Sequence, residues 1–172
     1  MMVRPGPSEL WFERLYSALH LPFWVGALVF GGAVFTALMV ASGLLTDLVD
    51  ELAAIGLLYF IPFGTIAAVF AQFGCRKARR GIEGLKDNVR ELRSGLELDV
   101  HPLCQVRNSL AMWLAVLVIT QPVYLSFGLP QSMSLEQRII VSIPFFYWTL
   151  FIGTFLWVWV YSLYTIFKIG KL

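Results

Sequence analysis

Charged residues are scarce in this chain, and four long stretches contain no Asp, Glu, Lys, Arg or His at all. Charged side chains make up 14% of the 172 residues, whereas soluble domains carry about 25%. A helix of ~20 residues crosses a hydrocarbon layer of about 30 Å, and each stretch is longer than that. The composition therefore predicts an all-α, polytopic integral membrane protein. The uncharged stretches are Leu21–Thr46, Leu52–Cys75, Asn108–Leu135 and Ile139–Phe167.

Histidine and cysteine are also scarce, with two of each in the chain. A metal site would draw on Cys75, His101 and Cys104, but Pro102 argues against a helical presentation of the last two, and three ligands are a minimum. A haem would need an axial ligand inside a span, and neither His20 nor His101 lies in one. We expect no metal, no cofactor and no disulfide, because both cysteines fall in the segment that we place in the cytoplasm.

Sequence motifs of catalysis are missing as well. The chain has no G-x-S-x-G, no H-E-x-x-H and no G-x-x-x-x-G-K-[ST], and no pair of carboxylates lies inside a span. Proton-coupled carriers keep ionisable groups within their spans. These absences disfavour an enzyme and a self-sufficient ion-coupled transporter, and the formal net charge of +2 is too small to indicate nucleic-acid binding.

Positive charge lies on one side of the predicted spans. With four spans, every Lys and Arg except Arg138 falls on the same face. The positive-inside bias then places both termini in the cytoplasm of a plasma or inner membrane. We expect no cleaved signal peptide. The prediction is one domain, 1–172, with spans at about 21–46, 52–75, 108–130 and 138–167 and a cytoplasmic connection at 76–107.

The segment before the first span predicts an amphipathic helix. Ser8 is a good N-cap after Pro5-Gly6-Pro7. A helix lying in the membrane interface would turn its aromatic face into the acyl boundary; a frayed arm is the alternative. The polar face consists of Glu9, Glu13, Ser17 and His20, and the apolar face of Trp11, Leu15, Ala18 and Leu19.

Small residues recur where helices are expected to pack. In lipid, close backbone approach at small side chains is the usual packing device. Such residues serve packing within the chain or a dimer face, and both uses stay open. Span one has a seam of Gly32, Thr36, Met39, Gly43 and Thr46 beside a ladder of Ala33, Ala37 and Ala41; Gly64 and Ala68 of span two and Gly153 of span four complete the predicted packing residues.

Prolines interrupt spans two and three near their middles. Pro62 predicts a kink in span two, and Pro122 follows Thr120 and Gln121 in span three. We single out Gln121 as the most polar side chain of the spans; its amide needs a partner, for which we expect a carbonyl freed by Pro122 or Pro62. The alternatives are a structural hydrogen bond and a contact to a solute at broken helices.

Span four begins with Ser134-Leu135-Glu136-Gln137, which predicts a capping box. A helix from Leu135 to Lys168 would be about 50 Å long and must tilt or project from the bilayer. Its many aromatic residues, from Phe145 to Phe167, indicate a lipid belt or a surface that faces a partner.

The cytoplasmic connection predicts a short basic amphipathic helix. Its apolar seam has three uses that stay open: lying on the membrane, pairing with a second copy, or docking to another subunit. Residues 98–102 are expected to be extended. The seam consists of Ile82, Leu85, Val89, Leu92 and Leu96, and the predicted lipid head-group residues are Arg76, Lys77, Arg79 and Arg80.

The leading hypothesis is a non-catalytic structural or accessory subunit of a membrane assembly, whose partners are lipids and other membrane subunits or further copies of itself, with no nucleic acid. The alternative is a homo-oligomeric channel whose path passes Gln121, Thr120 and Tyr124. A third hypothesis is a lipid-modifying enzyme that acts near His20, His101 and Arg107.

Overall fold

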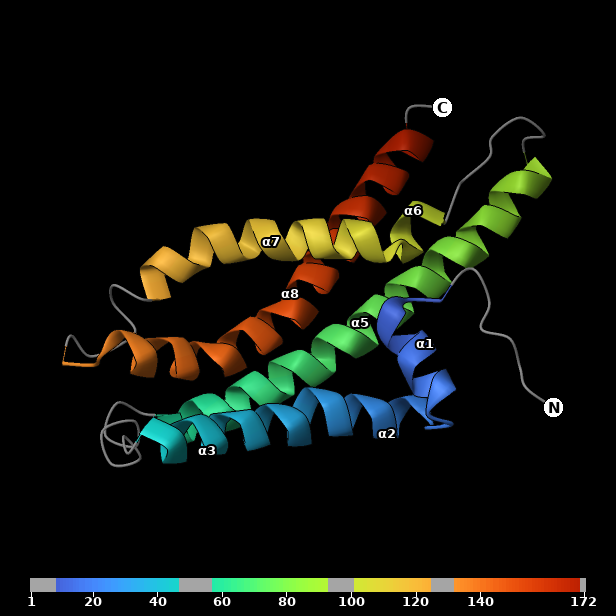
Figure 1. Cartoon of the computed structure of the whole chain (residues 1–172). Coiled ribbons are helices and arrows are strands. Elements are labelled where there is room, and N and C mark those ends of the chain that lie inside the picture. Colours follow the sequence, from blue (N-terminus) through green and yellow to red (C-terminus); the bar gives the residue numbers. More distant parts are fainter. Residues whose placement is uncertain (1–8, 47–56, 93–100, 125–131, 171–172) are drawn as a thin grey trace.

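The computed structural model describes residues 9–46, 57–92, 101–124 and 132–170, and these form helices without a strand (Figure 1). The predicted all-α class is confirmed for this part of the chain. The helices are α1 (Trp11–Ala18), α2 (Phe23–Leu28), the π-helical turn η1 (Val29–Ala33), α3 (Val34–Thr46), α5 (Leu57–Leu92), α6 (His101–Cys104), α7 (Val106–Val123) and α8 (Leu135–Gly170).

Two helices are long and apolar enough to cross a membrane. The first is Phe23–Thr46, in which α2, η1 and α3 follow one another over 24 residues with a mean hydropathy of 2.1. The second is Leu135–Ile169 of α8, with 35 residues and a mean hydropathy of 1.9. The predicted spans 52–75 and 108–130 fall partly outside the described residues. The structure thus supports a membrane association through two helices.

Helix α8 occupies the centre of the molecule. It packs against α3, α5 and α7, and Figure 1 shows it crossing between α7 on one side and α3 with α5 on the other. Helix α7 packs mainly against α8 and makes no comparable contact with α5. In the described parts of the predicted spans two and three, α8 is thus the main neighbour of α7, and α5 is not.

Helix α5 runs without interruption through the end of predicted span two. It continues for 36 residues, from Leu57 to Leu92, so the expected separate amphipathic helix is wrong. The residues from Cys75 to Arg80 include neither proline nor glycine, so nothing in this stretch breaks the helix. The Arg79 guanidinium also donates to Glu83 Oε1 at 2.7 Å, an ion pair across one helical turn that supports the continuation.

The capping box of α8 is confirmed. The Ser134 N–H donates to Gln137 Oε1 at 2.9 Å, and the Gln137 N–H donates to Ser134 Oγ at 3.3 Å. Gln137 Nε2 also donates to the Thr46 carbonyl at 3.1 Å. One side chain thus caps α8 and ties its start to the end of α3.

Helix α1 begins at Trp11 with Leu10 as its N-cap residue, later than the predicted Ser8, which lies outside the described residues. It ends with two hydrogen bonds of a Schellman motif: His20 N–H to the Ser17 carbonyl at 3.1 Å and Leu21 N–H to the Tyr16 carbonyl at 2.9 Å. His20 takes the left-handed conformation that this ending requires, with φ 55°. The motif turns the chain sharply from α1 into α2.

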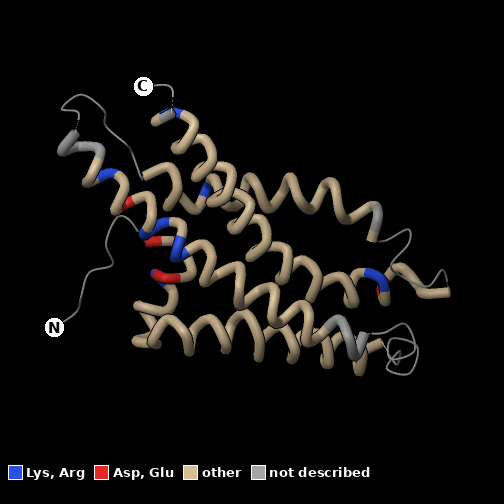
Figure 2. The backbone as a smooth tube through the Cα atoms, turned by 180° about the vertical axis from the view of Figure 1, so that it is seen from behind, with Lys and Arg blue, Asp and Glu red and all other residues tan. Residues whose placement is uncertain are grey.

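The hydrophobic core lies at the end of the molecule where α1 meets α5, α6 and α8. Figure 2 shows that the charged residues of the described part gather at this same end, apart from Glu136 and Arg138 at the start of α8. The best-buried cluster consists of Leu10, Phe12, Tyr16, Cys75, Ile82, Leu103, Cys104 and Val158.

The π-helical turn η1 leaves one carbonyl for a neighbouring helix. The Val34 N–H donates to the Val29 carbonyl, five residues back, rather than to that of Phe30. The Tyr147 hydroxyl of α8 donates to the Phe30 carbonyl instead. Gly31 of the same turn lies against Gln72 and Val69 of α5, where a Cβ atom would come within 2.5 Å of Gln72 Nε2.

Candidate functional site

A buried ion-pair cluster joins α1 to α5. Arg79 Nη2 donates to Glu13 Oε1 at 3.3 Å, and Arg79 Nε lies 3.0 Å from Glu13 Oε2. Arg76 Nε lies 3.5 Å from Glu13 Oε1, and the Leu10 N–H donates to Glu13 Oε2 at 3.0 Å. A buried charge needs such partners, because desolvation costs several kcal/mol per ion. Burial opposes the charged form of Arg79, yet the attraction of Glu13 and then Glu83 raises its pKa.

This cluster corrects the predicted orientation of α1. Glu13, which we placed on a solvated polar face, is 7% exposed, whereas Leu19 of the predicted apolar face is 50% exposed. The expected membrane interface is not tested by this geometry, but the buried face of α1 is set by protein partners. The reason is that the Glu13 carboxylate has its counter-ion on α5.

Aromatic side chains of α1 complete the docking. The Tyr16 hydroxyl donates to Gln72 Oε1 of α5, and Trp11 Nε1 donates to Thr154 Oγ1 of α8 at 2.9 Å. A Cβ atom on Gly26 would come within 2.4 Å of the Tyr16 ring, so only glycine lets α2 pass there. Burial, with a smaller contribution from Tyr147, raises the pKa of the Tyr16 hydroxyl far above its usual range and keeps it a neutral donor.

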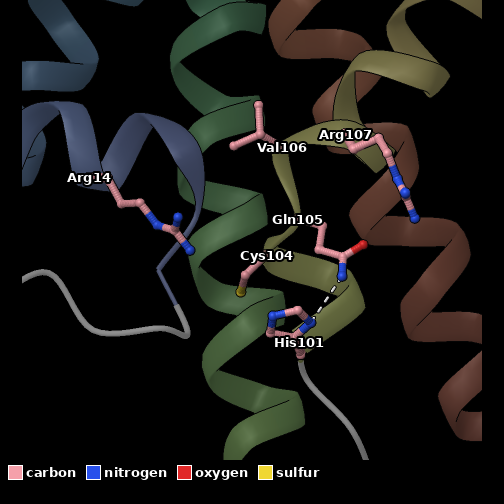
Figure 3. Close-up of a pocket in the computed structure, with 6 residues that line it drawn as sticks. All are labelled: Arg14, His101, Cys104, Gln105, Val106 and Arg107. Carbon is pink, nitrogen blue, oxygen red and sulfur yellow. Dashed lines mark hydrogen bonds between the residues drawn. The ribbon is translucent and has the colours of Figure 1, made fainter.

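Beside the cluster lies a pocket of about 400 Å³, lined by Arg14, His101, Cys104, Gln105, Val106 and Arg107 (Figure 3). Figure 3 shows Arg14 extending from α1, and Arg107 on the opposite side of the α6 turn. Gln105 Nε2 and His101 Nδ1 lie 3.0 Å apart. The pocket brings together His101 and Arg107 of the enzyme hypothesis, but His20 does not line it.

The predicted packing residues lie at helix contacts of the same chain. Gly32, Gly43 and Ala68 are buried and Thr36 is half-buried. A Cβ atom on Gly64 would come within 2.6 Å of the Phe35 ring, and one on Gly153 within 2.7 Å of Trp113 Cα. The alanine ladder of span one, by contrast, is exposed: Ala33, Ala37 and Ala41.

Of the predicted kink residues, Gln121 binds a neighbouring helix and Thr120 binds its own helix. Gln121 Nε2 donates to Ser142 Oγ of α8 at 3.3 Å, so the expected freed carbonyl as its partner is wrong. Thr120 Oγ1 donates to the Val116 carbonyl at 2.7 Å. Pro62 and Pro122 are exposed within α5 and α7. The serine of α8 supplies the acceptor because α8 is the helix that packs against α7.

The four predicted head-group residues divide into two pairs. Lys77 and Arg80 are exposed and free to face lipid. Arg79 is buried in the ion-pair cluster, and its predicted head-group role is wrong for that reason. Arg76 pairs with Glu13 and lies with its guanidinium 4.2 Å from the centre of the Phe23 ring.

Of the residues considered for a metal site, His101 and Cys104 line one pocket, and Cys75 and Cys104 share one core cluster. In the described part of the chain, no three His, Cys, Asp or Glu side chains lie close enough to hold a metal ion. Contrary to the expectation from Pro102, residues His101–Cys104 form a helical turn. Proline fits the first turn of a helix, where its missing N–H would be unpaired in any case.

Several side chains that shape this region were not singled out from the sequence. Gln72 is as polar as Gln121 and is 1% exposed, so Gln121 is not the most polar side chain of the spans. Gln72 could have been singled out from the sequence, because it is an amide side chain within the uncharged stretch Leu52–Cys75. The pairing of Glu13 had no such signal, because Arg79 lies 66 positions later in the sequence. The place of Arg14 in the pocket had none either, because the other lining residues lie between positions 101 and 107.

Comparison with known proteins gives no relative: no family model, no curated protein and no solved structure matches this chain.

Proposed function

We propose that this chain is a four-span membrane protein with both termini in the cytoplasm, and that it acts as a non-catalytic structural or accessory subunit of a larger membrane assembly. The observation that carries the proposal is the direction of its polar side chains. Polar side chains pair across helices, Glu13 with Arg79, Tyr16 with Gln72 and Trp11 with Thr154, while large apolar side chains face outward. Those exposed by more than 60% include Leu44, Leu45, Phe63, Phe70, Val118, Ile119 and Phe167.

The four-span topology has support from the charge distribution. Charged residues gather at one end of the described part of the molecule, and Arg138 lies at the other (Figure 2). Lys86, which is exposed on the cytoplasmic extension of α5, provides the test. A Lys86→Cys variant in intact cells should react with an impermeant maleimide only after the membrane is permeabilised. Labelling from outside would refute the orientation. Both native cysteines are buried and give little background.

We favour the outward face of the first long helix, Phe23–Thr46, as the surface that binds a lateral partner. Ala33, Ala37 and Ala41 are exposed there beside Val40 and Leu44, so a second helix can approach this backbone closely. This face is separate from the buried seam of Gly32, Met39, Gly43 and Thr46. The helix Phe23–Thr46 therefore has one face that packs within its own chain and another that is available to a partner.

Purification in mild detergent, native mass measurement and identification of co-purifying proteins test the assembly. We expect a complex with another membrane protein, and a stable lone monomer would overturn the proposal. Ala37→Phe should weaken the complex, whereas Ala115→Phe, an exposed alanine on α7, should leave it intact. Equal effects of both variants would remove the α3 face from the proposal.

A homo-oligomeric channel is the second candidate, and one observation favours it. Gln121 Oε1 is buried and accepts no hydrogen bond from the described residues, although Nε2 is bound to Ser142. A solute passing this point would satisfy the oxygen. Because α7 packs mainly against α8 rather than α5 in the described part of the chain, the proposed path draws on further copies. Gln121→Leu should then abolish solute flux into liposomes, and unchanged flux would exclude Gln121 from a path.

A further inference from the structure

We propose that the pocket between α1 and the start of α7 binds the phosphate of an anionic phospholipid, whose acyl chain lies along the exposed apolar face of α7. The inference rests on the membrane location proposed above. It concerns residues other than the basic run of α5, from which the sequence alone predicted head-group contacts.

The lining of the pocket suits an anion. Two of its six residues, Arg14 and Arg107, carry permanent positive charge, and none is acidic. His101 and Gln105 add polar groups at the same place. An arginine guanidinium offers a fork of donors that matches the oxygens of a phosphate.

The first turn of α7 adds to this attraction. Gln105 is the N-cap residue of α7, and its side chain makes no capping hydrogen bond to the first turn. The positive end of the dipole of this 18-residue helix therefore opens at the pocket. It reinforces the two arginines.

The apolar face of α7 begins at the pocket itself. Val106 lines the pocket, and with Leu110, Leu114 and Val118 it forms a stripe at four-residue intervals. All four are exposed, by 41%, 40%, 54% and 74%. From Val106 to Val118 the helix rises about 18 Å, which is comparable to one leaflet, half of the ~30 Å hydrocarbon core.

Pocket and stripe together select a lipid rather than a soluble anion. A free phosphate would use the arginines and leave the stripe unused. A zwitterionic lipid would use the stripe but bring a positive group towards Arg14 and Arg107. An anionic phospholipid uses both features, because it has one net negative charge beside its acyl chains.

Lipid retention by the full-length protein in mild detergent tests the inference. Native mass spectrometry would count bound phosphatidylglycerol and phosphatidylcholine after equal additions. We expect a preference for phosphatidylglycerol. Each arginine near an anionic surface contributes on the order of a fivefold change in affinity, so Arg107→Gln should lower phosphatidylglycerol binding about fivefold and Arg14→Gln with Arg107→Gln more. The matched control is Lys168→Gln, which removes an exposed cation outside the pocket and outside the predicted head-group residues.

Two further measurements test the apolar stripe and whether the bound phosphate belongs to a lipid. Leu114→Gln should lower phosphatidylglycerol binding, and millimolar inorganic phosphate should not displace the lipid. Equal retention of the two lipids, an equal loss with Lys168→Gln, or displacement by inorganic phosphate would each overturn the inference. Arg107 is exposed, so its substitution leaves the fold intact. The Lys86→Cys labelling tests the membrane topology independently of lipid binding. A failure of the proposed topology can therefore be distinguished from a failure of the lipid site.

Discussion

The Glu13 carboxylate lies against the Arg79 guanidinium, a residue 66 positions later in the sequence, with 3.0 Å between Oε2 and Nε. Both side chains are at most 10% exposed. In this pair the N-terminal helix and the long helix α5 neutralise each other's charge away from solvent. The docking of α1 therefore depends on electrostatics as well as on Phe12 and Tyr16.

Glu13→Gln should destabilise the protein by about 3 kcal/mol, because it leaves the buried Arg79 without its main counter-ion. The midpoint of thermal unfolding in detergent would fall accordingly. Glu83→Gln is the control: Glu83 pairs with the same arginine but is partly exposed, and its loss should cost less than about 1 kcal/mol. Equal losses of stability in the two variants would show that the buried Glu13–Arg79 pair stabilises the protein no more than the partly exposed Glu83–Arg79 pair does.

Gly153→Ala and Gly81→Ala should act in opposite directions. At Gly153 a Cβ atom would come within 2.7 Å of the Trp113 backbone on α7, and separating the two helices should cost about 1–3 kcal/mol. At Gly81 nothing lies within 4 Å, so alanine should stabilise the exposed helix by about 1 kcal/mol. Unfolding of both variants in the same detergent provides the comparison, and stabilisation by Gly153→Ala would contradict the close packing of α7 on α8.

Tyr147→Phe should destabilise the protein by about 1–3 kcal/mol, because the Phe30 carbonyl loses its hydrogen bond at the π-helical turn. Tyr164→Phe removes the same hydroxyl from the same helix at an exposed position. It should leave the unfolding temperature unchanged. If the two variants unfold alike, the hydroxyl of Tyr147 contributes nothing to the turn.

Cys104 should make stability depend on alkaline pH. Burial, as the largest cause, raises the pKa of its thiol from 9.0 to about 11. A raised pKa favours the protonated thiol in the folded state, so its contribution is complete below pH 9 and is lost as the pH rises through about 11. The free energy of unfolding of wild type minus that of Cys104→Ala, measured from pH 8 to 11, should fall by roughly 2–3 kcal/mol. A flat difference would refute the shift.

The sequence predicted what depends on composition and local pattern. Helical class followed from the uncharged stretches, and the capping box at Ser134 followed from residue types three apart, whose hydrogen bonds are local. The long helix α8 followed from its unbroken apolar run. Such features need no knowledge of which helices are neighbours.

Features that depend on helix neighbours were not predictable in this way. The partners of Glu13 and Gln121 lie on helices that only the packing order brings near, and α8 at the centre sets that order. Aromatic residues of α8 show the same point. Trp148 Nε1 donates to the Gly64 carbonyl at 3.0 Å and Trp157 Nε1 to the Pro102 carbonyl at 3.3 Å, so they anchor other helices as well as any lipid belt.

The hydrogen bond from Trp11 to Thr154 joins residues 143 positions apart, and this distance constrains biogenesis. Residues up to Thr154 must be synthesised before that bond can form, whereas Glu13 can meet Arg79 as soon as α5 is complete. The two contacts of α1 therefore form in a fixed order, the ion pair with α5 before the hydrogen bond with α8.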